Sequence, residues 1–181
     1  MGKSDWYLLP NEEMIESPSL VFYQNRIEEN IRLLLNMVDD KTRLRPHVKT
    51  HKCKEITRLM ITAGIQKFKC ATIAEAEMLG MSGAVDVLLA YQPVGPNVLR
   101  FIELIKKFPK TNFSCLVDYF DTAKQLNEKA VASNSILNIY IDVNVGMNRT
   151  GIVFDQVAGL FTELADLKNL SIIGLHAYDG H

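Results

Sequence analysis

The chain has 181 residues, of which 48% are hydrophobic, and its 20 Lys and Arg against 21 Asp and Glu give a formal net charge of −1. Such a chain can bury a sizeable core, and its balanced charge gives no electrostatic reason to expect nucleic acid or an anionic membrane as a partner. No apolar run has the length of a membrane span or the form of a signal peptide, so we expect a cytoplasmic protein. Three scattered cysteines indicate neither a disulfide framework nor a metal site.

The N-terminal part of the chain changes character at residue 24. Residues 5–18 are polar and contain two prolines, which predicts an arm that covers another part of the protein. Residues 19–23 form a short apolar run that predicts a strand. From Gln24 to Val38 apolar residues recur at helical spacing, which predicts an amphipathic helix packed on a sheet.

Residues 44–52, with the sequence LRPHVKTHK, hold the candidate centre of the chemistry. If residues 44–49 are extended, Arg45, His47 and Lys49 project to one side of the strand. A lysine crowded by Arg45 and by a protonated His47 is expected to lose its proton readily. A neutral amine is a nucleophile that forms Schiff bases with carbonyl compounds, pyridoxal phosphate among them. The alternative interpretation is a solvated basic loop.

The two histidines of this segment do not indicate a metal site. His47 and His51 are four residues apart, but Pro46 and two β-branched residues between them argue against a helix, and no glutamate lies between them. We therefore assign no metal ligand in this chain. Whether His51 orients Lys49 or is structural stays open.

The rest of the chain alternates between helical and strand patterns. Thr72 and Glu75 have the spacing of a capping box, which predicts that Thr72 is the N-cap of its helix. Gly64 is expected to end the first of these helices. Such alternation predicts βα units and a parallel sheet of six strands, counted from the Lys49 strand. The predicted helices are residues 56–63, 72–80, 98–105, 123–130 and 157–164, and the later strands are residues 67–71, 85–90, 113–117, 136–143 and 170–177.

Two architectures fit this alternation, a doubly wound open sheet and a (β/α)8 TIM-type barrel cut to about six βα units. The barrel is favoured because polar residues follow the carboxyl ends of successive strands, and a barrel gathers these ends into one site. No G-x-G-x-x-G motif follows the first strand, which argues against a dinucleotide-binding fold. The strand-end residues are Lys49, Thr72, Gln92, Asp118, the loop 144–149, His176 and Tyr178.

Four segments carry a resemblance to a known family: RPHVKTHK at 45–52, CATIAEAE at 70–77, DVNVGMNRTG at 142–151 and GLHAYDGH at 174–181. With these motifs in this order, the chain resembles the fold-type III pyridoxal-phosphate enzymes, which are alanine racemase-like barrels. Within them it is most similar to the D-threonine aldolase / D-serine dehydratase family. The resemblance covers residues 16–181.

The resemblance implies roles for particular residues. Lys49 would be the Schiff-base lysine and the acid or base at the substrate Cα, and Arg149 would lie near the phenolic oxygen of the cofactor. His176 or Tyr178 would lie near the cofactor ring, one of them meeting the pyridine nitrogen. The predicted catalytic residue is Lys49, and the predicted cofactor-binding residues are Lys49, His47, Arg149, His176, Tyr178, Thr72 and Gln92.

Plainer roles stay open for several of these side chains. Arg149 could cap the loop that carries it, and His176 and Tyr178 could form a satisfied buried pair. Gln92 and Asp118 could simply hydrogen-bond neighbouring loops.

The resemblance also predicts how the chain is organised. Residues 1–23 would be an arm and strand associated with a C-terminal β-domain that this chain lacks, and residues 24–181 a partial pyridoxal-phosphate-binding barrel. A full-length homodimer is implied, with pyridoxal 5′-phosphate and with a divalent metal, Mn²⁺ or Zn²⁺, whose ligands lie outside this chain. An open-edged six-stranded sheet is a poor monomer, so we interpret the chain as a fragment that is inactive by itself.

The implied function is that of a pyridoxal-phosphate-dependent lyase acting on a small-molecule D-amino acid. The preferred reaction is D-threonine aldol cleavage to glycine and an aldehyde. An amino-acid racemase or a D-serine dehydratase on the same fold is the alternative. A non-catalytic pyridoxal-phosphate-binding protein is a further alternative.

Overall fold

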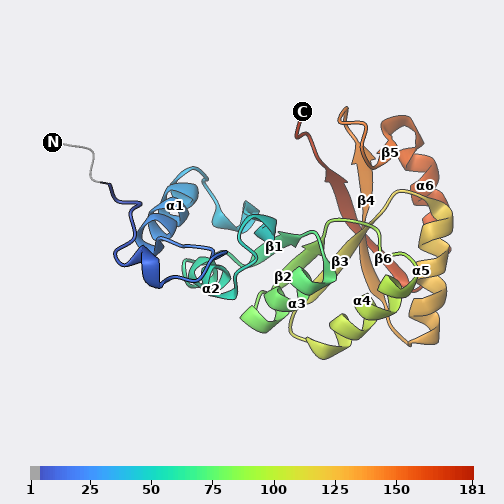
Figure 1. Cartoon of the computed structure of the whole chain (residues 1–181). Coiled ribbons are helices and arrows are strands. Elements are labelled where there is room, and N and C mark those ends of the chain that lie inside the picture. Colours follow the sequence, from blue (N-terminus) through green and yellow to red (C-terminus); the bar gives the residue numbers. More distant parts are fainter. Residues whose placement is uncertain (1–4) are drawn as a thin grey trace.

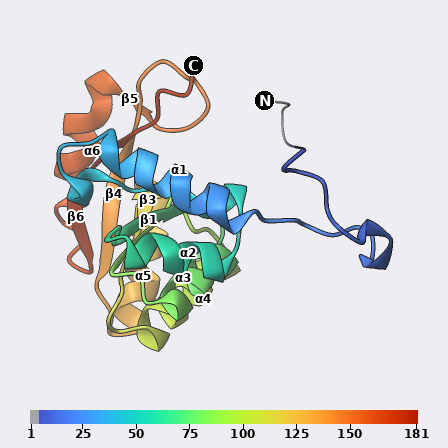
Figure 2. The same ribbon diagram turned by 90° about the vertical axis from the view of Figure 1, so that its left-hand side faces the viewer.

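The N-terminal segment contains little regular structure. The computed structural model describes residues 5–181, in which the segment before helix α1 forms only the 3-10 helix Glu12–Met14 and reaches away from the rest of the molecule (Figures 1 and 2). The strand predicted at residues 19–23 is wrong, because the segment has no strand partner among the described residues. Tyr23, at the end of this segment, packs instead against Trp6, with the centres of the two rings 5.2 Å apart. The predicted arm of residues 1–23 lies partly outside the described residues, and its association with a further domain stays a prediction.

Helices α1 (Gln24–Asn36) and α2 (Lys54–Thr62) form a lobe beside the sheet (Figure 1). The predicted helix from Gln24 is confirmed, but it packs mainly against α2 rather than on the sheet. Gly64 follows α2 with a φ of 99°, a conformation that glycine adopts without strain, so the predicted stop is also confirmed.

The remaining elements form a parallel sheet with helices on its outer face (Figure 1). All strand pairs are parallel, in the order β1, β2, β3, β4, and both β5 and β6 pair with β4. The alternation predicted from the sequence is confirmed, and the fold is a partial (β/α) barrel of about six units. The elements are β1 (Lys67–Cys70), α3 (Ile73–Ser82), β2 (Asp86–Leu89), α4 (Pro96–Lys107), β3 (Asn112–Val117), α5 (Phe120–Ala132), β4 (Leu137–Asn144), β5 (Ile152–Val153), α6 (Val157–Leu164) and β6 (Leu170–Ala177).

The core lies between the sheet and these helices. In β1, Phe68 and Cys70 are fully buried, whereas Lys67 and Lys69 are only half-buried. This alternation places the two lysines on the inner face of the sheet, opposite the helices. Burial of a large apolar side chain such as Phe68 contributes about 1.5–3 kcal/mol, so the outer face stabilises the fold and leaves the inner face for polar groups.

The predicted strand at residues 44–49 is replaced by a turn. Only His47 bridges to the sheet, opposite Lys69 of β1, and Val48–Thr50 is a 3-10 helix that contains Lys49. The physical reason is local, since His47 Nδ1 accepts a hydrogen bond from the backbone N–H of Lys49 and turns the chain at that point. The sixth strand of the sheet is therefore the two-residue β5.

Candidate active site

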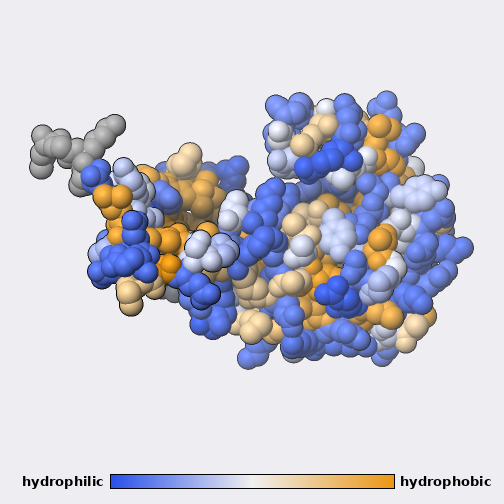
Figure 3. All heavy atoms as spheres, in the orientation of Figure 1, coloured by the Kyte–Doolittle hydropathy of each residue, from blue (hydrophilic) through white to orange (hydrophobic). Residues whose placement is uncertain are grey.

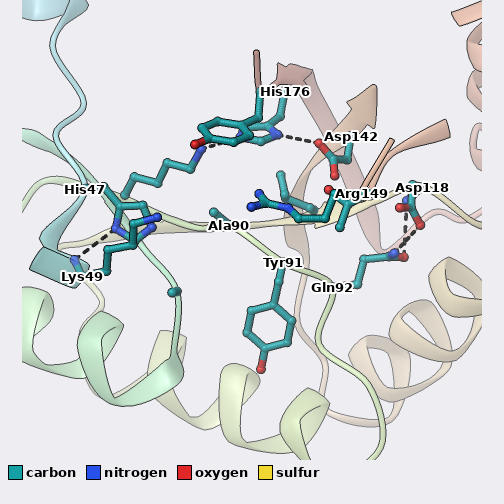
Figure 4. A pocket seen from close by; sticks show the side chains of 14 residues that line it. His47, Lys49, Ala90, Tyr91, Gln92, Asp118, Asp142, Arg149 and His176 are labelled. Carbon is teal, nitrogen blue, oxygen red and sulfur yellow. Dashed lines mark hydrogen bonds and ion pairs between the residues drawn. The ribbon is translucent and has the colours of Figure 1, made fainter. Parts of the chain in front are cut away.

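A cavity of about 330 Å³ opens at the carboxyl ends of the strands (Figure 4). Its size suits a small molecule rather than a macromolecule. Residues far apart in the sequence meet there, as expected for the mouth of a barrel. Six of the residues predicted from the sequence line this cavity: Lys49, His47, Gln92, Arg149, His176 and Tyr178.

Thr72 lies outside this cavity and lines a neighbouring one. Its side-chain oxygen accepts a hydrogen bond from the backbone N–H of Glu75 at 3.1 Å, which confirms the predicted N-cap of α3. The Glu75 carboxylate in turn accepts from the backbone N–H of Ala71 at 2.8 Å and pairs with Lys52. The hydroxyl of Thr72 thus caps the start of α3, and its predicted contact with a cofactor stays a prediction.

His47 is neutral, contrary to the protonated imidazole expected beside Lys49. Burial, together with the charges of Lys49 and Lys69, lowers the pKa of His47 to about 4. Its Nδ1 also accepts from the Lys49 backbone at 3.1 Å, a contact that requires an unprotonated nitrogen. Arg45, which was expected on the same face, pairs with Asp86 at the start of β2 and does not line the cavity.

Lys69 and Asp142 are two further site residues that were not predicted from the sequence. Lys69 Nζ lies 2.7 Å from His176 Nε2, and His176 Nδ1 lies 2.6 Å from the Asp142 carboxylate (Figure 4). Burial lowers the pKa of Lys69, and Asp142 opposes this effect. The contact joins β1 to β6 across the inner face of the sheet.

This chain of contacts limits what His176 can do. Because both ring nitrogens are engaged, His176 has no nitrogen left for a ligand. Tyr178 is then the better candidate of the predicted pair for a polar contact with a cofactor. Its ring lies 4.9 Å from the Arg149 guanidinium and 5.3 Å from Lys69 Nζ, distances at which a cation interacts with an aromatic face.

Arg149 lies in the loop between β4 and β5, and hydrogen bonds to the Asn144 side chain hold this loop in shape. The Asn144 side chain accepts hydrogen bonds from the backbone N–H groups of Gly146 and Asn148. Gly151 has a φ of 95°, and a Cβ atom there would lie 2.6 Å from the backbone nitrogen of Asn144. Only glycine therefore allows the loop to return so closely against β4.

Asp118 fixes the other end of this loop. Its carboxylate accepts from the backbone N–H of Gly151 at 2.9 Å and from the Gln92 side chain. Gln92 and Asp118 therefore do make the loop-stabilising hydrogen bonds that the sequence left open, although both also line the cavity (Figure 4).

The His51 side chain makes a structural hydrogen bond and none with Lys49 among the described residues. Its Nδ1 accepts from the backbone N–H of Cys53 at 3.0 Å, next to the start of α2, and burial lowers its pKa. Within residues 5–181 no group of three or more His, Cys, Asp or Glu side chains could hold a metal ion. None of the helices in this range is long and apolar enough to span a membrane.

The cavity fits pyridoxal phosphate, a flat anionic aldehyde. Lys49 offers an amine for the aldehyde carbon, and Tyr178 offers an aromatic side chain. Among the described residues, Lys69 and Arg149 form no ion pair with a carboxylate, so their charges are available to an anionic ligand. A parallel (β/α) barrel with such an amine at its mouth is the arrangement of the fold-type III pyridoxal-phosphate enzymes.

Comparison with known proteins identifies the family within this class. The family model of the alanine racemase N-terminal domain matches residues 23–181, and the chain belongs to this family. A D-threonine aldolase from Arthrobacter sp. is 29% identical over 168 residues, which is 92% of this chain and 44% of the relative.

Solved structures show the same fold. A D-threonine aldolase from Filomicrobium marinum matches with a TM-score of 0.81 and 27% identity, over 92% of this chain and 45% of that one. A D-threo-3-hydroxyaspartate dehydratase from Delftia sp. HT23 matches with a TM-score of 0.77 and 23% identity, over 91% of this chain and 44% of that one. The chain thus spans less than half the length of the relatives it matches.

Proposed function

We propose that this chain is the pyridoxal-phosphate-binding part of a lyase that acts on D-3-hydroxy amino acids, cleaving D-threonine to glycine and an aldehyde. The observation that carries the proposal is the placement of Lys49 in one cavity with Arg149 and Tyr178. The similarity to D-threonine aldolases of two organisms supports the choice of reaction. The activity, the D-amino acid substrate and an expected homodimer belong to the proposal for the whole protein.

The residues of the cavity would have different roles in binding the cofactor and in proton transfer. Bound pyridoxal phosphate supplies an electron sink that stabilises negative charge at the substrate Cα. Lys49 would hold the cofactor through its amine and would later carry a proton to or from Cα. Arg149 would donate hydrogen bonds to the phenolic oxygen of the cofactor, because a guanidinium presents several N–H donors. Neutral His47 holds the turn that presents Lys49.

The first test concerns the cofactor. The protein is mixed with pyridoxal phosphate, its visible absorption is recorded before and after borohydride, and mass spectrometry locates the reduced adduct. We expect an adduct at Lys49 in the wild type and in Lys54→Ala, and none at that site in Lys49→Ala. Lys54 is a suitable control because it lies on α2 outside the cavity. An adduct at Lys69 instead would contradict the assignment of Lys49.

The second test concerns the reaction. The whole protein with pyridoxal phosphate and Mn²⁺ is expected to release glycine from D-threonine, and failure to do so would contradict aldol cleavage. Pyruvate and ammonia from D-serine would indicate a dehydratase instead, and loss of optical rotation a racemase. Unchanged amino acids despite stoichiometric bound cofactor would indicate a non-catalytic binding protein. Sedimentation of the whole protein tests the homodimer.

A further inference from the structure

The contact between Lys69 and His176 is unusual because the imidazole lies between a lysine and a carboxylate. The Asp142 carboxylate accepts from the His176 ring at 2.6 Å, and both side chains are largely buried. A carboxylate so close to an imidazole normally favours the doubly protonated, charged ring. Here, however, a lysine Nζ lies 2.7 Å from the second ring nitrogen.

The numbers of hydrogen-bond donors and acceptors on the three side chains determine which tautomer of His176 allows both hydrogen bonds. An ammonium group has only donors, and a carboxylate has only acceptors. If His176 carries its proton on Nδ1 and none on Nε2, then Nδ1–H donates to Asp142, and Nε2 accepts from Lys69. A second proton on Nε2 would face the Lys69 donor and repel it.

We propose that Lys69 is a positioning residue of this site, which keeps His176 neutral with its proton on Nδ1 and fixes the imidazole between β1 and β6. The positive charge of the site then lies on Lys69 and Arg149, both near the Tyr178 ring, and His176 contributes an uncharged ring. Only the identity of the ligand that would contact the His176 ring rests on the proposed function. The contact itself is a property of the chain.

The surroundings of Lys69 support this assignment. Its lowered pKa follows from burial and from the charges of Lys49, Arg149 and Arg45, while Asp142 acts in the opposite direction. Lys69 is the only basic side chain hydrogen-bonded to His176 among the described residues. Removal of Lys69 would leave Asp142 as the one charged partner of the ring, and the ring would gain a proton.

The experiment reads the imidazole directly by ¹⁵N-detected NMR of the cofactor-free protein labelled with ¹⁵N at histidine and lysine side chains. Near neutral pH the wild type is expected to show a protonated Nδ1 and an unprotonated, downfield Nε2 for His176. The downfield Nε2 signal should be lost in Lys69→Met, which keeps the aliphatic stem, and retained in Lys69→Arg, which restores a donor. Lys67→Met, on the same strand and face but outside the cavity, should match the wild type.

Two results would overturn the proposal. One is an Nε2 signal in Lys69→Met identical to that of the wild type, since Asp142 alone would then set the tautomer. The other is a doubly protonated His176 in the wild type. If Lys69→Met does not fold, the wild type still decides the question, because a coupling across the hydrogen bond between Lys69 Nζ and His176 Nε2 is expected, and its absence contradicts the contact. Neither result depends on cofactor binding, so the proposed function is tested separately.

Discussion

His47 supports the Lys49 turn only while its imidazole is neutral. Its pKa in the folded protein is about 4, below the usual value of about 6.5, so the unfolded chain binds more protons between these values. The contribution of His47 to stability is therefore fully present above pH 6.5 and is lost progressively as the pH falls toward 4. Below pH 4 no further loss is due to this group.

We expect His47→Asn to reduce this pH dependence. An asparagine Oδ1 can accept from the Lys49 backbone as the His47 ring does, but it does not titrate. Denaturant unfolding midpoints measured near pH 7 and near pH 5 should fall less in the variant than in the wild type. His51 is unchanged in both proteins and cancels in the comparison. Equal losses in the two proteins would show that His47 does not carry the effect.

The sequence predicted individual site residues at or just past the ends of strands and missed Lys69 and Asp142, which lie within β1 and β4. Arg149 and Tyr178 could be placed at the mouth because a strand pattern ends just before each of them. Lys69 lies inside β1, and the alternation of Lys67, Phe68, Lys69 and Cys70 contained the signal for an inward-facing lysine. No pattern in the sequence indicates which distant side chain Lys69 meets, because the contact with His176 depends on the curvature of the sheet.

At the scale of single elements, helix α3 depends on its N-cap. Thr72→Ala removes the acceptor for the Glu75 N–H and should lower the free energy of unfolding by about 1 kcal/mol. Thr72→Ser retains the hydroxyl and should cost much less. Chemical denaturation of the three proteins measures both effects. A Thr72→Ser loss as large as that of Thr72→Ala would assign the effect to the methyl group rather than to the cap.

The β4–β5 loop depends on Asp118 in a similar way. In Asp118→Asn the new amide group would face one of two donors, Gln92 or the Gly151 N–H, so one hydrogen bond is lost. We expect the Gly151 amide to exchange with solvent roughly 3- to 10-fold faster, as one hydrogen bond is worth about 0.5–1.5 kcal/mol.

Hydrogen exchange of the cofactor-free protein measures this directly. Asp121→Asn makes the same change of charge on α5, away from the loop, and should leave the Gly151 amide unaffected. Unchanged exchange in Asp118→Asn would mean that the loop is held by Asn144 and its backbone contacts alone.

Helices and strands whose hydrophobic pattern extends over about eight residues were predictable, whereas shorter segments were not. The strand at Leu170–Ala177 and the helix at Val157–Leu164 match their predicted bounds because apolar residues recur along the whole of each element. Residues 19–23 and 44–49 were predicted as strands from a few β-branched or alternating residues. A strand also needs a partner, and a local hydrogen bond of His47 competed successfully with sheet pairing.

At the scale of the whole molecule, two areas of exposed apolar surface bear on association with other chains. One comprises the lobe of α1 and α2 and the segment before it, where Figure 3 shows hydrophobic atoms at the surface. In that segment Leu8 and Leu20 are 59% and 74% exposed. The other is a groove between α6 and β6, lined by Phe154, Phe161 and Leu175 among others. Strand β6 pairs only with β4, so its outer edge also presents unpaired backbone groups within the described part of the chain.

An exposed strand edge beside an apolar groove favours association with other chains. We therefore expect the 181-residue chain to self-associate as its concentration rises. Phe161 is 52% exposed, so Phe161→Glu should leave the fold intact while introducing a charge into the groove, and it should shift association to higher concentration. Sedimentation velocity at several concentrations measures the shift.

Leu99→Glu is the matched control, because Leu99 is 47% exposed on α4 and lies outside the groove. If association is driven by the groove and the β6 edge, this variant should behave like the wild type. If both variants weaken association equally, the added negative charge is responsible rather than the loss of the apolar contact. A wild type that stays monomeric at every concentration would show that the twist of β6 and the polar side chains around it suffice to protect the edge.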